Sequence, residues 1–256
     1  MILVIDVGNT NVDFAFYEGK NMVKRWWRPT ANSQIQTSKQ IKQNKAKIEK
    51  VIISSVVPAV DQRLKRAVQR LWGIKPHFVT AENISGIRVR VRKKKEVGAD
   101  RVVDALAAYK LYGGPAIIVD FGTATTFDVI TANGEYLGGA IAPGISLARD
   151  ALYNQTAKLP KIAIQAPKLV IGNDTESAMQ SGLVYGYVAM VEGMIGRIIT
   201  EFRKQKVESR KRKAGVNVIA TGGLARLICK YTNIVDKIDD NLTLEGLRMI
   251  GEELDD

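Results

Sequence analysis

ILVIDVGNTNVDFAF, residues 2–16, and IIVDFGTATTFD, residues 117–128, follow one pattern. In each, an apolar run ends in an aspartate, Asp6 or Asp120, and is followed by any residue, a glycine and a polar turn that contains threonine. A second apolar segment comes after the turn. The apolar runs are rich in β-branched residues, which favour buried strands. The chain therefore uses one strand–turn–strand unit twice.

The turn of this unit is suited to binding phosphate. Its glycine has no Cβ and lets the backbone fold back tightly, so the amide groups of Gly8, Asn9 and Thr10 are expected to point into a cleft and bind an anion. The side chains of Asn9 and Thr10 add donors. In the second copy the pattern is repeated by Gly122, Thr123, Thr125 and Thr126. Two ordinary hairpins with polar turns are the alternative, which the repeated Asp-x-Gly core makes less favoured.

Asp6 must act differently from the rest of the turn, because a carboxylate repels phosphate. We expect it to hold a hydrated Mg²⁺ that bridges to the phosphates of a nucleotide. The turn also differs from two common phosphate-binding motifs, since neither Gly-Lys-Ser/Thr nor Gly-x-Gly-x-x-Gly follows either strand.

The composition is typical of a soluble globular protein, because 46% of the 256 residues are hydrophobic and 25% are charged. No apolar run approaches the length of a membrane span, and Met1 leads directly into a predicted strand rather than a signal peptide. Cys229 is the only cysteine and His77 the only histidine, so neither an intramolecular disulfide nor a zinc site is expected. These features predict a cytoplasmic protein without a membrane partner.

The net charge of +12 raises the question of a nucleic-acid partner. The basic residues gather at residues 88–95 and 203–213. In the first cluster arginines alternate with Val89 and Val91, which predicts a half-buried strand with a solvated face. The second is typical of a helix end that runs into a surface loop. Solvated surface is the favoured interpretation and nucleic acid is not an expected partner. Attraction of anionic substrates and nonspecific polyanion binding are the alternatives.

Three strands followed by alternating helices and strands are predicted in each half of the chain. The first half has expected strands at residues 2–6, 11–17, 22–29, 51–54, 77–80 and 88–91, and helices within 31–48 and at 59–71 and 99–112. The second half has expected strands at 116–120, 125–131, 136–142 and 216–220, and helices at 145–154, 175–203, after Gly223 and at 242–252. This order predicts an α/β fold of duplicated ribonuclease-H-like (actin-like ATPase) domains with a central nucleotide cleft. Gly113-Gly114-Pro115 marks the predicted boundary between domains 1–113 and 114–256.

Gly98-Ala99-Asp100-Arg101 lies at the start of a predicted helix, where an aspartate is commonly a cap. Beside a phosphate cleft the same residues suit a phosphotransferase. Asp100 would accept the proton of an acceptor hydroxyl, and Arg101 would bind a substrate carboxylate through two hydrogen bonds. Phosphoryl transfer requires little more than in-line positioning and charge neutralisation, which a base, a cation and two phosphate loops supply.

Thr221-Gly222-Gly223-Leu224-Ala225 follows a predicted strand and opens a short helix. A Gly-Gly turn by itself indicates little. After a buried strand, however, its glycines permit close approach by a flat ring or a sugar. This position favours a contact with adenosine.

The chain resembles the type III pantothenate kinase family over nearly its full length. The resemblance is carried, in this order, by DVGNTN, GADR, DFGTATTFD, GGAIAPG, TAKLP, IGNDT and TGGLA. That family belongs to the acetate kinase, sugar kinase, Hsp70 and actin superfamily. The resemblance implies ATP-dependent phosphorylation of the primary hydroxyl of pantothenate, the first step of coenzyme A synthesis, with Mg²⁺ accompanying the ATP.

The resemblance also implies the roles of individual residues. Asp100 would be the catalytic proton acceptor, Asp120 would bind a monovalent cation, K⁺ or NH₄⁺, and Thr123 would bind ATP. The ATP phosphates would be bound by Asp6, Val7, Gly8, Asn9, Thr10, Asn11, Val12 and Asp13. Pantothenate would be contacted by Gly98, Ala99, Asp100, Arg101 and Thr175. The repeat alone would give Asp120 the same magnesium role as Asp6, and here we follow the family's assignment.

Members of this family are homodimers, which directs attention to the predicted helix 175–203. An apolar stripe falls mostly at helical spacing beside three glycines. The stripe consists of Met179, Leu183, Met190, Met194 and Ile198, and the glycines are Gly182, Gly186 and Gly193. Core packing explains the stripe by default. The small residues are also compatible with two helices that approach closely across a two-fold axis.

The sequence departs from the family pattern just before GADR. The family usually has Tyr-Asp/Glu-Asn-Pro there, whereas this chain has Val91-Arg92-Lys93-Lys94. The difference leaves open a kinase of the same fold that acts on another small hydroxy compound, or a substrate carboxylate that meets Lys93 or Lys94. A further alternative is a non-catalytic transcriptional accessory factor. The retained aspartates and Arg101 argue against it, because a binding module has no need for all of them.

Overall fold

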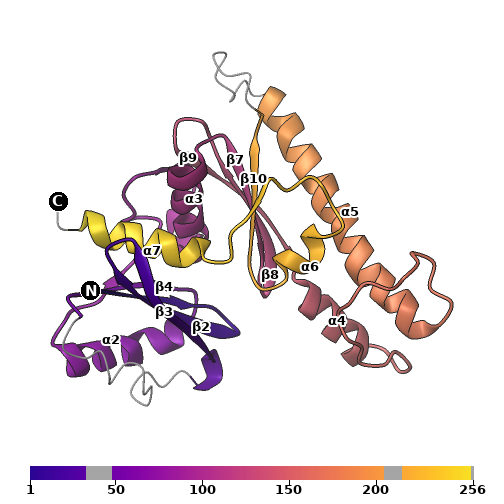
Figure 1. The fold of residues 1–256 in the computed structure, drawn as a ribbon, viewed down its shortest axis with the longest axis horizontal. Helices are drawn as coiled ribbons and strands as arrows, with labels where there is room; N and C mark the ends of the chain where they lie inside the picture. Colours follow the sequence, from indigo (N-terminus) through magenta and orange to yellow (C-terminus); the bar gives the residue numbers. More distant parts are fainter. Residues whose placement is uncertain (33–47, 205–214, 255–256) are drawn as a thin grey trace. The chain divides into compact units, whose positions relative to one another are not determined.

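The protein contains a five-stranded and a six-stranded sheet (Figure 1), and five strands of each follow the same order. In one sheet β3, β2, β1, β4 and β5 lie side by side in that order, and in the other β9, β8, β7, β10 and β11 do the same. β1 (Ile2–Val7) is antiparallel to β2 and parallel to β4. β7 (Ala116–Phe121) is likewise antiparallel to β8 and parallel to β10. This repetition confirms the predicted duplicated ribonuclease-H-like fold.

The computed structural model describes residues 1–32, 48–204 and 215–254, and the chain divides into two compact units. Unit 1 consists of Met1–Ala107 and Asn241–Asp256, and unit 2 of Ala108–Asp240. These units differ from the predicted domains 1–113 and 114–256, because the division falls within a helix and the C-terminal segment belongs to unit 1. The physical reason is packing, since the last helix buries its apolar side against the first sheet.

The first sheet is covered on both faces. Alternate residues of a strand point to opposite faces, so Leu3 and Ile5 join a core cluster with α2 (Pro58–Trp72), whereas Val4 joins another with α3 (Ala99–Tyr112) and α7 (Leu242–Glu253). The remaining elements of unit 1 are β2 (Asn11–Glu18), β3 (Asn21–Pro29), η1 (Thr30–Asn32), β4 (Lys50–Ser55), β5 (His77–Phe78), β6 (Arg88–Val89) and η4 (Lys94–Glu96).

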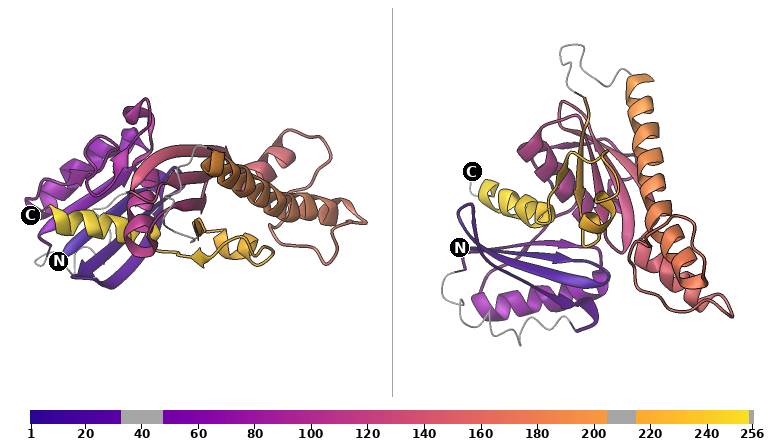
Figure 2. Two further views of the ribbon diagram at one scale, coloured as in Figure 1. Left: turned by 90° about the horizontal axis from the view of Figure 1, so that it is seen from above. Right: turned by 45° about the vertical axis from the view of Figure 1, so that its right-hand side comes forward.

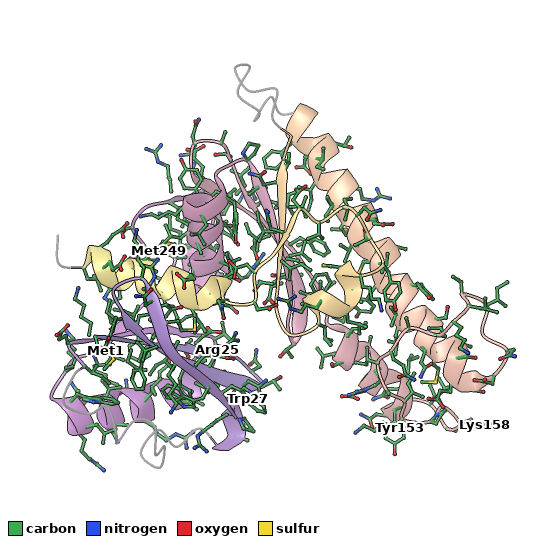
Figure 3. The ribbon with its side chains drawn as sticks, in the orientation of Figure 1. Met1, Arg25, Trp27, Tyr153, Lys158 and Met249 are labelled. Carbon is green, nitrogen blue, oxygen red and sulfur yellow. The ribbon has the colours of Figure 1, made fainter. Side chains whose placement is uncertain are left out.

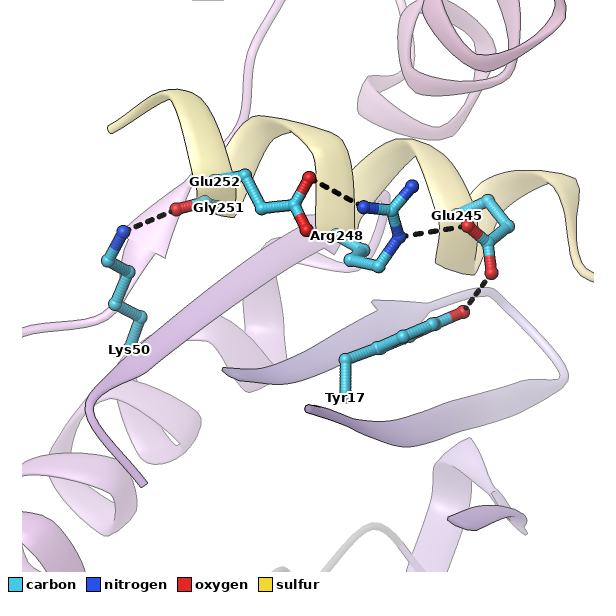
Figure 4. Close-up of polar contacts among 6 residues, drawn as sticks. All are labelled: Tyr17, Lys50, Glu245, Arg248, Gly251 and Glu252. Carbon is cyan, nitrogen blue, oxygen red and sulfur yellow. Dashed lines mark hydrogen bonds and ion pairs between the residues drawn. The ribbon is translucent and has the colours of Figure 1, made fainter. Parts of the chain in front are cut away.

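A polar network also holds α7 on the first sheet (Figure 4). The Arg248 side chain is only 5% exposed and is ion-paired with Glu245 at 2.9 Å and with Glu252 at 2.6 Å. The Tyr17 hydroxyl of β2 donates to Glu245 at 2.9 Å, and the Lys50 ammonium of β4 donates to a carbonyl of α7 at 2.6 Å. Burial, followed by the nearby Glu245 carboxylate, raises the pKa of Tyr17 far above its usual range, so the hydroxyl stays a donor.

The second sheet is packed against α5 (Thr175–Lys204), a long helix that runs beside the strands in each view (Figures 1 and 2). Leu183, Val191 and Ile195 of this helix belong to one core cluster with Ile117 and Val119 of β7. The remaining elements of unit 2 are β8 (Ala124–Ile130), β9 (Glu135–Pro143), α4 (Ile145–Asn154), β10 (Asn217–Thr221), α6 (Ala225–Cys229) and β11 (Lys237–Ile238).

The two sides of α5 differ in character. Its apolar stripe lies against the core of unit 2, with Met179 and Leu183 buried and Met190, Met194 and Ile198 partly buried. The glycines lie on the exposed side, where an added Cβ would meet no atom within 4 Å at Gly182, Gly186 or Gly193. Core packing therefore accounts for the apolar stripe, and the glycines form a smooth exposed strip beside it.

One expectation about α5 was wrong. Within the described part of the chain, Thr175–Phe202 form one helix that is long and apolar enough to cross a membrane by length and composition, although we expected no apolar run of that size. A core helix of a large sheet passes the same test, because one whole side of it is apolar. The packing of α5 in the core of unit 2 is that of such a helix.

Most predicted elements are present, and the differences are local. The strands predicted at 77–80 and 88–91 are reduced to the two-residue strands β5 and β6, and β11 was not predicted. β5 and β11 are short and carry little period-two pattern, so sequence periodicity describes them poorly. At 88–91 the alternation is clear, but only Arg88 and Val89 form a strand. The helix expected within 31–48 falls mostly outside the described residues, as does most of the basic segment 203–213.

Replacing Arg248 by alanine should destabilise unit 1. The change leaves the Glu245 and Glu252 carboxylates without their shared cation, and removal of one partner of a buried ion pair costs about 3 kcal/mol. The free energy of unfolding, measured by urea denaturation, gives the loss. Arg66→Ala on the exposed side of α2 is the control for loss of an arginine. Equal stability of the two variants would contradict the role given to Arg248.

Candidate active site

The first Asp-x-Gly turn follows β1 directly. Asp6 is the last but one residue of β1 and its side chain is half-buried, whereas the Val7 and Val12 side chains on either side of the turn are buried. The Gly8 amide donates to the Asn11 carbonyl at 2.9 Å. We expected this amide to bind an anion, and the structure corrects this because the amide closes the turn itself. Because the Val7 and Val12 side chains are buried, a ligand could contact only the backbone of these residues.

Thr30 holds the conformation of this turn through two hydrogen bonds. Its hydroxyl donates to the Gly8 carbonyl at 2.7 Å, and its amide donates to the Thr10 carbonyl at 2.9 Å. Thr30 is itself buried, whereas the side chains of Asn9, Thr10 and Asn11 are exposed. The turn is thereby held with its polar side chains outward, as an anion site requires. Thr30 could not be predicted from local sequence, because it directly follows β3 and only the pairing of β2 with β3 brings it here.

Two neighbouring strands place further polar groups beside Asp6. Strand pairing aligns Asp6 with Ser54 of β4 and with Asp13 of β2, and aligned residues point to the same face. Ser54 is fully buried, and its hydroxyl has no hydrogen-bond partner among the described residues. Asp13 is ion-paired at 3.0 Å with Arg25 of β3, which is labelled in Figure 3. Ser54 is a site residue that the sequence analysis missed.

The GADR segment meets the same end of the first sheet. Val56, which follows β4, donates its amide to the Val7 carbonyl at 3.0 Å, and a Cβ on Gly98 would lie 3.3 Å from the Val56 side chain. Gly98 is therefore tightly placed beside the ends of β1 and β4. The half-buried Asp100 accepts a hydrogen bond from the Arg101 amide at 2.8 Å through Oδ1. Asp100 thus lies inside the first turn of α3 rather than at its cap, and it belongs to the same end of unit 1 as the first Asp-x-Gly turn.

The second Asp-x-Gly turn encloses its aspartate more closely. Asp120 is the last but one residue of β7 and is paired with Thr221 of β10. A Cβ on Gly122 would lie 3.2 Å from Asp120 Oδ2, and one on Gly222 would clash with Asp120 Oδ1. Gly222 also has a φ of 90°, which favours glycine. Two glycines, one in the turn after β7 and one in the turn after β10, therefore leave space for this carboxylate.

The threonines of the second turn do not act as one group. Thr123 is half-exposed, and its carbonyl accepts a hydrogen bond from the Gly144 amide at 3.1 Å. Thr125 and Thr126 are buried, and the Thr126 hydroxyl donates to the buried Asp128 at 3.0 Å. Of the threonines predicted for the second turn, Thr123 alone keeps an accessible side chain, because Thr125 and Thr126 point to opposite faces of β8 and both faces are buried there.

Thr175 is the first residue of α5, is exposed and belongs to unit 2. The preceding Asp174 accepts a hydrogen bond from the Ser177 amide at 2.7 Å, as a helix cap does. Hydrogen bonding with Ser177 lowers the pKa of the Asp174 carboxyl. The cap fixes where the helix begins and therefore where Thr175 lies.

The groups around Asp6 and Asp120 that could bind a metal ion carry oxygen atoms, which suit cations that prefer oxygen ligands. No three His, Cys, Asp or Glu side chains gather into a metal site in the described portion of the chain. A cation at either aspartate would be held by one carboxylate together with hydroxyl, backbone or water oxygens, which are ligands for Mg²⁺ and K⁺. The unpartnered Ser54 hydroxyl beside Asp6 fits such a shell.

Solved structures place the fold in a known class. A protein from Campylobacter jejuni described as a Baf family transcriptional activator has a TM-score of 0.63 at 20% identity, covering 99% of this chain and 98% of its own. A protein from Listeria monocytogenes described as an N-acetylmannosamine kinase has a TM-score of 0.56 at 13% identity, covering 100% and 99%. At these identities the likeness concerns the fold alone. The fold is the duplicated ribonuclease-H-like (actin-like ATPase) fold.

Sequence comparison then gives the family. The family model for type III pantothenate kinase matches residues 2–197. A type III pantothenate kinase of Moorella thermoacetica is 42% identical over 98% of this chain and 99% of its own length, and one of Exiguobacterium is 44% identical over 98% of both. The chain belongs to the type III pantothenate kinase family.

Replacing each of the two glycines after β10 by alanine, one at a time, should show that only Gly222 is needed to accommodate the Asp120 carboxylate. Gly222→Ala places a Cβ against Asp120 at a positive φ, so we expect a loss of about 1–3 kcal/mol in the free energy of unfolding. Gly223→Ala is the matched control, since a Cβ there would meet no atom within 4 Å. Urea denaturation of both variants measures the difference. If both are as stable as the parent, the glycine at 222 is not needed to accommodate the Asp120 carboxylate.

Proposed function

We propose that this chain transfers the γ-phosphoryl group of ATP to the primary hydroxyl of pantothenate, forming 4'-phosphopantothenate in the first step of coenzyme A synthesis. The observation that carries the proposal is the pairing of family membership with two equivalent Asp-x-Gly turns at the ends of central strands. Such turns present polar groups where a triphosphate needs them. The proposed ATP contacts are residues 6–13 in the first turn and Thr123 in the second.

Unit 1 supplies the groups around the reacting phosphate. Residues 6–13 bind the ATP phosphates, with the exposed side chains of Asn9, Thr10 and Asn11 as donors. Asp6 holds the Mg²⁺ that accompanies ATP through water, with the Ser54 hydroxyl beside it. The divalent ion supplies charge neutralisation on the phosphates. Thr30 keeps the turn in the conformation that presents these donors.

Asp100 and Arg101 act on the acceptor. Asp100 accepts the proton of the pantothenate hydroxyl as the oxygen attacks the γ-phosphorus, and the bond from the Arg101 amide keeps its carboxylate in place. Arg101, with Gly98 and Ala99, binds the substrate. The tight placement of Gly98 beside Val56 supports this role, because it fixes the base relative to the first phosphate turn.

Unit 2 supplies the remaining contacts in this proposal. Asp120 binds K⁺ or NH₄⁺, and its enclosure by Gly122 and Gly222 supports a role distinct from that of Asp6. Thr123 binds ATP, and Gly223, with open space around it, lies against the adenosine. Thr175 contacts pantothenate. The enzyme is a cytoplasmic homodimer, and the exposed glycines of α5 support close approach of a second copy.

A kinase of the same fold for another small hydroxy compound is the second candidate. The observation in its favour is the segment Val91-Arg92-Lys93-Lys94, which replaces the pattern usual in the family before GADR. A coupled assay of ADP release decides between the two candidates, with pantothenate, other hydroxy acids and sugars as acceptors, each with and without K⁺. A higher rate with another acceptor than with pantothenate would favour the second candidate. Absence of pantothenate-dependent ADP release would reject the first.

Replacing Asp100 by asparagine should lower kcat by about 10²- to 10⁴-fold, since the amide cannot accept the proton. The affinity for ATP, measured by isothermal titration calorimetry, should stay within about twofold of the parent, because Asp100 is placed at the acceptor. Asp150→Asn on α4 is the control for loss of an aspartate. A kcat unchanged in the Asp100 variant would remove its role as the base.

A further inference from the structure

A hollow in unit 1 borders the segment that precedes GADR. It has a volume of about 490 Å³ and is lined by Glu82, Val91, Arg92, Lys93, Lys94, Lys95 and Glu96. Its wall is formed by the chain between β6 and α3, including the short helix η4. Four of the lining side chains are cationic and two are carboxylates, so positive charge is in excess. A hollow of this charge attracts anions.

The cations of the hollow are not equally engaged. Lys93 is ion-paired with Glu96 at 2.8 Å, which neutralises both. The side chains of Arg92, Lys94 and Lys95 are exposed and make no hydrogen bond or ion pair with any described residue. Three cationic side chains therefore remain for a ligand, against the single carboxylate of Glu82. Arg92 can bind a carboxylate through two hydrogen bonds, and the lysines act as mobile point charges.

The wall of the hollow leads directly into the candidate acceptor site. η4 ends at Glu96, the Val97 amide donates to the Lys94 carbonyl at 3.1 Å, and Gly98 follows at once. Asp100 lies at the start of the next helix. The three cations therefore precede Asp100 by five to eight residues along the chain (100 − 95 and 100 − 92). Both features belong to unit 1.

We propose that this hollow, in place of Arg101, binds the carboxylate of the acceptor acid and that Arg92, Lys94 and Lys95 set the preference of the enzyme for an acid over a neutral alcohol. The inference rests on the proposed function, since it concerns the acceptor of that reaction. It gives the unusual segment at residues 91–95 a specificity-determining role. The three cations remain solvated in the absence of a substrate and exchange part of that solvation for the carboxylate when it binds.

The test is a triple variant, Arg92→Gln/Lys94→Gln/Lys95→Gln, which removes the unpaired cations and keeps the Lys93–Glu96 pair. Steady-state rates are measured with pantothenate and with its neutral alcohol analogue, pantothenol. We expect the KM for pantothenate to rise about tenfold, because charge-assisted hydrogen bonds at a partly exposed site are lost. The KM for pantothenol and the KM for ATP should change less than twofold.

The matched control removes three charges from residues of the same unit that do not line the hollow. Arg63→Gln/Arg66→Gln/Arg70→Gln alters only exposed side chains of α2 and lowers the net charge equally. If this control raises the KM for pantothenate as much as the test variant does, the effect is long-range attraction and the inference is overturned. An unchanged ratio of kcat/KM for pantothenate to that for pantothenol in the test variant overturns it also. If the parent chain does not phosphorylate pantothenate, the proposed function itself fails and this inference falls with it.

Discussion

The structure depends on one constraint, a carboxylate that must stand at the carboxyl end of a central strand without entering the core. In β1 the period of two sends Leu3, Ile5 and Val7 into the core cluster that includes α2, so Asp6 points to the other face. β7 does the same with Ile117 and its alternate residues toward α5. The tight turn that follows each aspartate is possible because a glycine stands there. Every candidate function begins from these two carboxylates.

The two turns have the same framework but different surroundings. In unit 1 the turn is fastened from behind by Thr30 and leaves its polar side chains exposed. In unit 2 the Asp120 carboxylate is enclosed by glycines from two strands, and the threonines of β8 are turned inward. Open polar side chains suit contact with phosphates, whereas an enclosed carboxylate suits a cation that has lost water. This asymmetry is the structural support for giving the two aspartates different roles.

The last helix shows how much of unit 1 is built from distant parts of the chain. α7 brings Leu244, Leu247 and Ile250 onto the first sheet, and Arg248 joins its two glutamates to Tyr17. The helix closes the same face of the sheet on which Asp6 lies, because Val4 packs in the cluster that contains the apolar side chains of α7. That face of the first sheet is therefore covered only when residues up to Ile250 are packed on it. The sheet that carries the first turn thus depends on residues from both ends of the chain.

The sequence by itself determined the two Asp-x-Gly turns, the order of most strands and helices, and the placement of Asp100 at a helix start. These follow from local rules, namely the period of a strand, the freedom of glycine and the preference for acids at helix starts. The tertiary structure alone decided that Thr30 and Ser54 join the first turn, that the Gly8 amide is occupied, that Gly222 makes room for Asp120 and that α7 belongs to unit 1. Each of these is a contact between residues far apart along the chain. Such contacts are fixed by strand register and core packing, which local sequence does not encode.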